Sequence, residues 1–387
     1  MPFLKQRQKI YLDYAATTPV DARVFAKMKP YLTDLWGNSR SLHQFGKNMA
    51  QALENARETI ATALDCAPSE IYFTSSATEA NNTVLKGVAF SNEYKGKHII
   101  ISQVEHASVY ETANYLSQLG FEITRIPVDD YGRVDLQALK DVIRSDTILI
   151  SVMHVNNETG TIQPIEDIAR ICKEEGVLFH TDASQSFGKL PLSLHRLPVD
   201  FLTASSHKIY GPLGAGLLFV RRGRSLVPLL HGGQHESGVR ASTVNIPAVV
   251  GFAEAVEIYK QEREEERRKL QAWKEEISAF LQQHVEKIRI NTPPEDSVYH
   301  ILNFSVAGAD SELLQMALDQ KGIAVSTGSA CSSGRVKESR ILKACGVPSS
   351  FIRGTIRVSL GRFTTQEEVS YFCKTITELI KQVRKIS

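Results

Sequence analysis

The sequence predicts an α/β protein with a mostly parallel central sheet and a smaller α+β domain at its C-terminal end. Strand-length apolar runs alternate with helical patterns before residue 260. The charged stretch Gln261–Leu270 has the i,i+4 charge spacing of a solvated helix, so we place a domain boundary near residue 260. Beyond this helix, ILNFSV (301–306) and TIRVSLG (355–361) are expected to be strands.

Composition excludes several classes of protein. The chain has 387 residues, 42% hydrophobic and 23% charged, which is typical of a folded globular protein. Its net charge of +2 gives no electrostatic case for binding nucleic acid or an anionic membrane. No apolar run is long enough to span a bilayer, and the N-terminal segment lacks the apolar stretch of a signal peptide. Five cysteines without a CxxC pair indicate reduced thiols, no metal centre and a cytoplasmic location.

The apolar runs before residue 260 share a feature: polar residues follow each of them. Because the carboxyl ends of parallel strands form the crevice in which ligands bind, we expect these residues to converge on one pocket. They are Thr78 after 70–76, His106 after 98–104, Asn157 after 147–155, Asp182 after 177–181 and Lys208 after 200–206.

Lys208 and Asp182 are the strongest candidates for chemistry. Lys208 precedes a glycine-rich turn and a second strand, 217–222, and burial there would free its amine for a Schiff base. The alternative is a solvated surface lysine. A buried Asp182 needs a cationic partner, such as the protonated pyridine nitrogen of pyridoxal phosphate (PLP). The alternative is an N-cap for a helix that begins at Ala183.

An anion site is predicted where the segment 75–82 opens a helix. Hydroxyl and backbone N–H groups at a helix start suit a phosphate, although a Ser/Thr cap is also common there. Ser205 and His207 could supply further donors. His106 could lie over an aromatic cofactor or move protons, or it could be structural.

Two further residues point to substrate chemistry. Cys331 lies in STGSACSSG (326–334), which indicates an exposed, mobile loop, and its thiol is a capable nucleophile. The other cysteines are expected to be inert. Arg357 interrupts an apolar strand, so its guanidinium needs an anion. A substrate carboxylate or a structural salt bridge would serve.

Ten motifs in order resemble those of the cysteine desulfurases of the NifS/IscS type, and the match spans nearly the whole chain. They are YLDYAATTP (11–19), GNSRSLHQFG (37–46), TSSATEANN (74–82), EHASV (105–109), MHVNNETG (153–160), HTDASQSFGK (180–189), SSHKIYGP (205–212), HGGQHESGVRAST (231–243), STGSACSSG (326–334) and IRVSLGRFTT (356–365). The resemblance implies a PLP-dependent, aspartate-aminotransferase-like fold (fold type I) and a homodimer. It also implies a large domain, 15–260, and a small domain, 1–14 and 261–387, which carries the catalytic cysteine loop at about 326–336.

The resemblance also implies a role for each site residue. Lys208 would bind the cofactor covalently and act as the proton carrier, Asp182 would pair with its ring nitrogen, Gln185 would bond its phenolic oxygen, and His106 would stack on its ring. Ala77, Thr78, Ser205 and His207 would hold the phosphate, with Thr243 from the other subunit. Asn157 and Arg357 would hold the substrate carboxylate, with Asn38 nearby, and Asn157 would also contact the cofactor.

The implied reaction converts L-cysteine into L-alanine and a persulfide on Cys331, which passes its sulfur to an acceptor protein. The acceptor would serve iron–sulfur cluster assembly or tRNA thiolation. Members that serve an iron–sulfur scaffold often carry a longer tail after the position of Val369 than this sequence has. An iron–sulfur scaffold is therefore in doubt as the acceptor, and tRNA thiolation stays open. Ser76 and Ser206 stand where the family commonly has glycine. The alternatives are an aminotransferase or selenocysteine lyase, a PLP-free thiol hydrolase, and a non-catalytic sulfur carrier.

Overall fold

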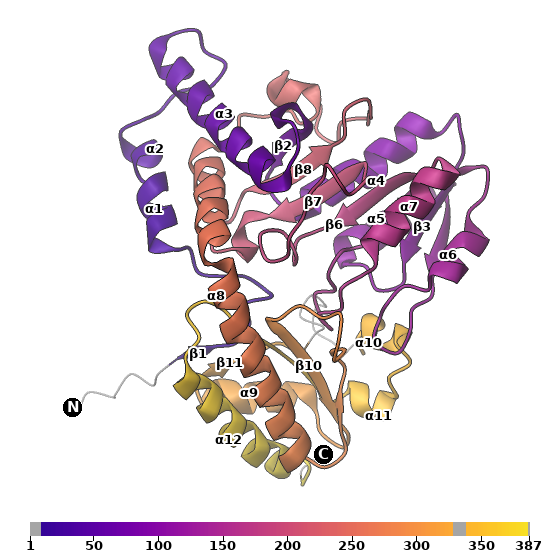
Figure 1. Cartoon of the computed structure of the whole chain (residues 1–387), viewed down its shortest axis with the longest axis vertical. Helices are drawn as coiled ribbons and strands as arrows, with labels where there is room; N and C mark the ends of the chain where they lie inside the picture. Colours follow the sequence, from indigo (N-terminus) through magenta and orange to yellow (C-terminus); the bar gives the residue numbers. More distant parts are fainter. Residues whose placement is uncertain (1–8, 328–337, 386–387) are drawn as a thin grey trace.

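The computed structural model describes residues 9–327 and 338–385 (Figure 1). A seven-stranded sheet has the order β2-β8-β7-β6-β5-β3-β4. Its strands are β2 (Ile71–Thr74), β3 (His98–Ser102), β4 (Glu122–Ile126), β5 (Thr147–Ser151), β6 (Leu178–Asp182), β7 (Phe201–Ser205) and β8 (Gly216–Val220). All neighbours from β7 to β4 pair in parallel, whereas β8 is antiparallel to both β2 and β7. The predicted mostly parallel sheet is confirmed, and each of the five apolar runs overlaps one of its strands.

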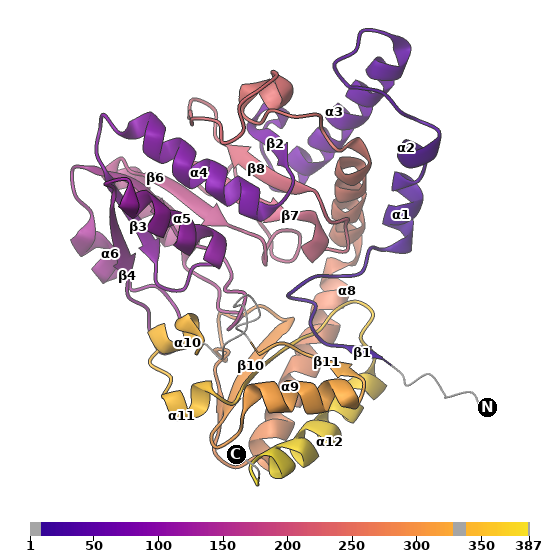
Figure 2. The ribbon, with the colours of Figure 1, turned by 180° about the vertical axis from the view of Figure 1, so that it is seen from behind.

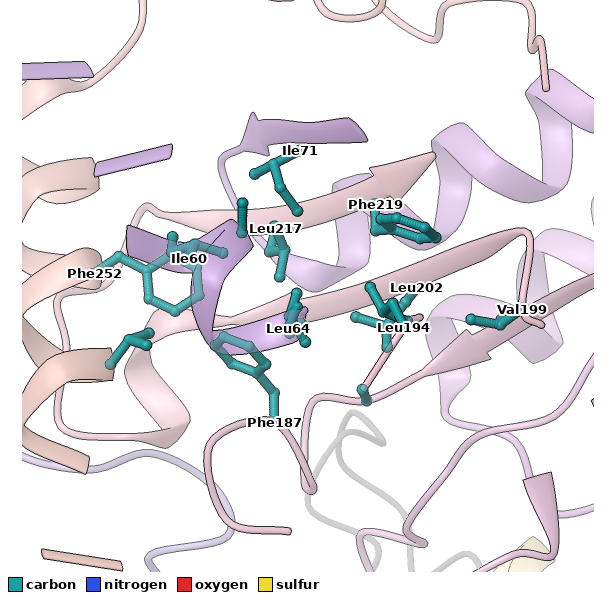
Figure 3. Packing of buried hydrophobic residues seen from close by; sticks show 14 of the residues in the cluster. Ile60, Leu64, Ile71, Phe187, Leu194, Val199, Leu202, Leu217, Phe219 and Phe252 are labelled. Carbon is teal, nitrogen blue, oxygen red and sulfur yellow. The ribbon is translucent and has the colours of Figure 1, made fainter. Parts of the chain in front are cut away.

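Helices cover both faces of this sheet. One face packs on α4 (Ala77–Asn92) and α5 (Ala107–Gln118), which lie in front of the sheet in Figure 2. The other face packs on α3 (Gln44–Leu64), α7 (Ile165–Glu175) and the first part of α8 (Ile246–His284). Alternate strand residues serve the two faces: Leu202 packs in the second cluster, while its neighbour Phe201 packs under α4 and α5. Figure 3 shows Leu202 and Leu217 of the sheet close to Leu64 of α3.

The remaining elements of this part of the chain are α1 (Ala22–Met28), α2 (Pro30–Thr33) and α6 (Leu136–Val142). The strand β4 was not foreseen in the sequence. It lies at the edge of the sheet, and four of its five residues are at least partly exposed. An edge strand with one exposed side lacks the continuous apolar run that marks the central strands.

The second part of the molecule is built on small sheets. The strands β9 (Ile288–Ile290), β10 (Ile301–Val306) and β12 (Thr355–Ser359) form an antiparallel sheet in the order β12-β10-β9. The predicted strands 301–306 and 355–361 are therefore confirmed. A parallel pair joins β1 (Ile10–Tyr11) to β11 (Ile323–Ala324), so the first described residues pack with the C-terminal elements. The helices here are α9 (Ser311–Gln320), α10 (Arg340–Ala344), α11 (Ser349–Ile352) and α12 (Gln366–Val383).

The helix expected over 261–270 is the middle of the much longer α8, which has 39 residues and runs through both parts of the molecule (Figure 1). Its core partners change along its length. Phe252 and Tyr259 pack in the cluster under the large sheet, whereas Leu270 and Ile277 pack in the cluster around β10 and β12. This change supports our proposal of a domain division near residue 260. Within the described ranges, we find no helix with the length and apolarity needed to cross a membrane.

The second cluster depends on the buried face of α8. Ile277 is fully buried, so Ile277→Ala is expected to lower the free energy of unfolding by about 2–5 kcal/mol, because lost apolar burial and a residual cavity add. Urea unfolding followed by circular dichroism measures the change. Gln282→Ala, an exposed position of the same helix, is the control and should shift stability by less than about 0.5 kcal/mol. Equal shifts for both variants would contradict this role of α8.

Candidate active site

A cavity of about 710 Å³ opens at the carboxyl ends of the central strands. Most of the predicted site residues line it: Ala77, Thr78, His106, Asn157, Asp182, Gln185, Ser205, His207, Lys208 and Arg357. The structure therefore brings the residues that follow all five apolar runs into one place. Arg357 comes from β12 of the second part, so the cavity lies between the two parts of the chain.

Three predicted residues are not found in this lining. Cys331 lies outside the described residues. Asn38 is exposed between α2 and α3, and its side-chain oxygen accepts from the Arg40 backbone N–H at 3.0 Å. Thr243 is exposed ahead of α8. The Arg40 guanidinium donates to the Gln234 carbonyl at 2.5 Å, which ties the loop that carries Asn38 to the segment that leads to Thr243.

The proposed phosphate end of the cavity is the N-terminus of α4. Ser76 is the N-cap of this helix, and its hydroxyl accepts from the Glu79 N–H at 3.2 Å. Two bonds from the Arg240 guanidinium, the shorter 2.8 Å, hold the Glu79 carboxylate. Ser76 has an extended backbone, so a residue other than glycine fits there without strain. The helix start predicted over 75–82 is confirmed, and its N-terminus faces the cavity through Ala77 and Thr78.

His207 lies beside this phosphate end. Its Nδ1 is 3.0 Å from the Thr17 hydroxyl oxygen. Burial, followed by the positive charges of Lys208 and Lys189, lowers the pKa of His207 to about 4. The imidazole is therefore neutral near pH 7, and it can take part in hydrogen bonds without adding charge.

Ser206, the second position where the family commonly has glycine, is fully buried, and its hydroxyl has no hydrogen-bond partner in the structure. The chain makes room for it at Gly211. A Cβ atom at that glycine would lie 2.0 Å from the Ser206 hydroxyl oxygen. The serine is therefore accommodated by a glycine on the following turn.

Asp182 ends β6, and most of it is buried. One carboxylate oxygen accepts from the Asn81 amide at 2.7 Å, and the other accepts from the Ser184 backbone N–H at 2.9 Å. Thr203 in turn donates to the Asn81 side-chain oxygen at 2.5 Å. The helix at Ala183 that was an alternative role for Asp182 is wrong, because a series of turns follows this strand.

Lys208 closes a single 3₁₀ turn, Ser206–Lys208, after β7. Its ammonium donates to the carbonyls of Ala15 and Ala16 at 2.7 and 2.6 Å. Gln185 also donates to the Ala15 carbonyl, at 2.8 Å. The short segment after β1 therefore holds two predicted site residues at once, and sequence reasoning did not assign it a role.

His106 is the N-cap of α5. Its Nδ1 accepts from the Ser108 backbone N–H at 3.1 Å and lies 2.8 Å from the Ser108 hydroxyl oxygen. Burial is the main cause that lowers the pKa of His106, so a neutral ring faces the cavity. His106 thus has a structural role as a cap and also the predicted position at the cavity, while its place over a cofactor stays a prediction.

Arg357 makes the salt bridge that was the alternative to substrate binding. Its guanidinium donates to the Asp13 carboxylate and to the Asn157 carbonyl, each at 2.8 Å. Nevertheless, its Nε is buried without a hydrogen-bond partner, and so is the Asn157 side-chain oxygen. Both groups line the cavity and retain capacity for a polar ligand.

The segment 338–341 forms another wall of the cavity, which the sequence did not predict. Ser339 donates to the buried Glu158 carboxylate at 2.6 Å. The Arg340 guanidinium donates to the backbone carbonyls of Gln103 and Glu105 and lies over the Tyr110 ring. These contacts fix the chain that follows the predicted cysteine loop against the large sheet.

Comparison with known proteins identifies the family. The sequence matches the family described as aminotransferase class-V over residues 10–372. The chain belongs to this family. It is 43% identical to cysteine desulfurase IscS of Dictyoglomus turgidum, over 98% of this chain and 97% of the relative, and 42% identical to that of Methanosarcina thermophila, over 99% and 94%.

Solved structures agree. A structure described as a NifS-like protein has a TM-score of 0.91 and 40% identity, covering 97% of this chain and all of the other. A NifS-like protein from Rickettsia africae has a TM-score of 0.87 and 30% identity, with the same coverage. The chain is therefore a member of the cysteine desulfurase branch of the class-V aminotransferases, whose members depend on PLP.

The cavity fits this cofactor. A carboxylate for the ring nitrogen, a lysine amine and a helix N-terminus for a phosphate all line it. The unpartnered Asn157 oxygen and Ser184 hydroxyl add polar capacity. In the described residues, no group of three His, Cys, Asp or Glu side chains is placed to hold a metal ion.

The burial of Glu158 should make stability depend on pH. Burial raises the pKa of Glu158 from 4.5 to about 7. Between pH 4.5 and about pH 7 the Glu158 carboxyl loses its proton in the unfolded state and keeps it in the folded state, so rising pH favours unfolding. Glu158→Gln is therefore expected to be more stable than the wild type at pH 8, on the order of 3 kcal/mol, and nearly equal to it at pH 4. Urea unfolding at both pH values tests this.

Glu174→Gln, an exposed glutamate on α7, is the matched control and should change little at either pH. If Glu158→Gln and the wild type kept the same stability difference at pH 4 and pH 8, the carboxyl would not hold its proton in the folded protein.

Proposed function

We propose that this protein is a PLP-dependent cysteine desulfurase that takes sulfur from L-cysteine, releases L-alanine and holds the sulfur as a persulfide on Cys331. The observation that carries the proposal is the meeting of Lys208, Asp182 and Arg357 in one cavity, although they come from the turn after β7, from β6 and from β12 of the other sheet. Relatives named cysteine desulfurase IscS, 38–44% identical over nearly the whole chain, support the same reaction.

The residues divide the work as follows. When bound, PLP supplies an electron sink at the substrate Cα. Lys208 would hold the cofactor and then carry the proton at Cα. Asp182, held by Asn81, would keep a proton on the ring nitrogen. His106 would stack on the ring, and Gln185 would donate to the phenolic oxygen. Ala77, Thr78, Ser205 and His207 would hold the phosphate.

Arg357 and Asn157 orient the substrate carboxylate, which satisfies the Arg357 Nε that is now unpartnered. The Cys331 thiolate then attacks the substrate sulfur. A sulfur–sulfur bond would form while the carbon–sulfur bond breaks. The electron pair of the broken bond would stay on the substrate carbon, which would take up a proton, equal to the one that Cys331 loses on ionising, and become the methyl group of alanine. The persulfide passes its terminal sulfur to an acceptor protein for iron–sulfur cluster assembly, as the IscS names suggest, or for tRNA thiolation.

The described cysteines support Cys331 as the nucleophile. Cys66, Cys172, Cys345 and Cys373 are free thiols. Burial raises the pKa of each thiol, to about 12 for Cys66, Cys345 and Cys373, so little thiolate forms near neutral pH. Unpaired thiols also fit the cytoplasm, where we place the protein.

We also propose a homodimer in which Thr243 reaches the phosphate of the partner subunit, with Asn38 beside it. Large apolar side chains are exposed near Asn38, among them Trp36 at 63% and Leu42 at 89%. Such a patch is typical of an interface between subunits. The Arg57–Glu236 ion pair, at 2.8 Å and largely buried, fixes the segment before Thr243 on the large sheet, where Glu236 also accepts from the Phe73 N–H.

Cys331→Ala is expected to keep the bound-cofactor spectrum and to lose sulfide release from L-cysteine by at least about a hundredfold, because the nucleophile is absent. Peptide mass spectrometry with thiol trapping should find an extra sulfur on the Cys331 peptide of the wild type only after L-cysteine is added. Cys66→Ala should behave as the wild type. Undiminished sulfide release from Cys331→Ala would refute the persulfide mechanism and favour another PLP reaction.

Lys208→Ala should abolish covalent attachment of the cofactor by borohydride, because no other amine is expected to form the Schiff base. Mass spectrometry of the reduced protein measures the attachment. Lys260→Ala, remote from this cavity on α8, should be labelled as the wild type is. Attachment that persists in Lys208→Ala at full yield would overturn the assignment of the lysine.

A further inference from the structure

A buried amine and imidazole lie next to the cavity. Lys189 is 4% exposed and His300 is 2% exposed, and Lys189 Nζ lies 3.0 Å from His300 Nε2. Lys189 follows β6, where its backbone N–H donates to the Ser186 carbonyl, and His300 precedes β10. The contact therefore joins the two parts of the molecule. No carboxylate within the described ranges forms a salt bridge with Lys189.

The pair continues to a site residue. His300 Nε2 lies 3.4 Å from the Gln185 side-chain oxygen, while the Gln185 amide nitrogen donates to the Ala15 carbonyl at 2.8 Å. Both ends of this amide are therefore held. An amide nitrogen carries two hydrogens, so one N–H of Gln185 remains for the cavity that it lines.

The protonation states of Lys189 and His300 decide whether His300 can hold the Gln185 side-chain oxygen. A charged Lys189 donates to the Nε2 lone pair, and that nitrogen then cannot donate to Gln185. A neutral Lys189 instead allows Nε2–H to be shared between the Lys189 lone pair and the Gln185 oxygen. Only the arrangement with a neutral Lys189 therefore lets His300 hold the Gln185 oxygen.

The surrounding charges work against an ammonium at this position. Burial, followed by Lys208, lowers the pKa of Lys189 to about 7, while Glu266 raises it. Burial also lowers the pKa of His300 well below its usual value, with Lys189, Lys274, Arg357 and Lys208 as further positive neighbours. An uncompensated charge in this place is expensive, and a merely structural position would be filled more cheaply by an apolar side chain.

We propose that Lys189 and His300 are positioning residues that hold the Gln185 amide toward the phenolic oxygen of PLP and set the pH at which the bound cofactor loses its proton. The inference rests on the proposed function, because it takes the cavity as the cofactor site. A donated N–H favours the deprotonated cofactor. Loss of either residue should therefore raise the pH of that transition.

The test is a pH titration of the visible absorption band of the purified holoenzyme. Lys189→Met and His300→Leu should each raise its midpoint by about one pH unit. His300→Gln keeps an N–H near the position of Nε2 and should restore a midpoint close to that of the wild type. If His300→Leu does not fold, His300→Asn replaces it, because its shorter amide does not reach Gln185, and the same rise is expected.

Lys274→Met is the matched control. Lys274 is also a buried lysine, 6% exposed, but it donates to Ser297 and the Val298 carbonyl and does not touch Gln185. Its midpoint should stay at that of the wild type. Wild-type midpoints in Lys189→Met and the His300 variants, or an equal shift in Lys274→Met, would overturn the proposal. A wild-type protein without any cofactor band would instead refute the cofactor assignment on which it rests.

Discussion

The site depends on the direction of β8, the strand that runs against the rest of the large sheet. Because β8 is antiparallel to both of its neighbours, β2 runs in the same direction as β7. The end of β2 and the start of α4 therefore lie at the same edge as Lys208. Gly216 lets the chain between β2 and α4 pass close to the start of β8, since a Cβ atom at this glycine would lie 2.4 Å from the Ser76 carbonyl carbon. Without this hairpin, the helix N-terminus proposed for the phosphate would lie at the opposite edge.

The second part of the chain completes the cavity through a few contacts. The segment after β1 offers its carbonyls to Lys208 and Gln185, and Asp13 next to it holds Arg357 on β12. The anchor at Ser339 and Arg340 adds a third contact with the large sheet. A movement of the second part would therefore displace Lys208, Arg357 and the chain next to the predicted cysteine loop.

Much of the site could be predicted because its residues follow long apolar runs, and burial on both faces of a parallel sheet makes those runs visible in sequence. The features that the sequence did not predict are contacts between residues far apart in the chain. Asn81 holds Asp182 across 101 positions, and Lys189 meets His300 across 111. Contacts between residues so far apart leave no periodic pattern in the sequence. A helix at Ala183 was weighed from a capping residue alone. Asp182 does accept from the Ser184 backbone N–H, as an N-cap would, but turns rather than a helix follow it.

The charges of the cavity indicate the kind of ligand it holds. Burial keeps the nearby histidines neutral, with the pKa of His207 and His180 at about 4. Lys208, Arg340 and Arg357 line the described cavity at separate positions. Asp182 accepts from an amide and a backbone N–H rather than from one of these groups. Its carboxylate can therefore pair with a cationic ring nitrogen, while Lys208 lies at one separate position for a carbonyl carbon and Arg357 at another for a carboxylate. A cofactor that has a ring nitrogen for Asp182 and a carbonyl group for Lys208 fits this separation of charges.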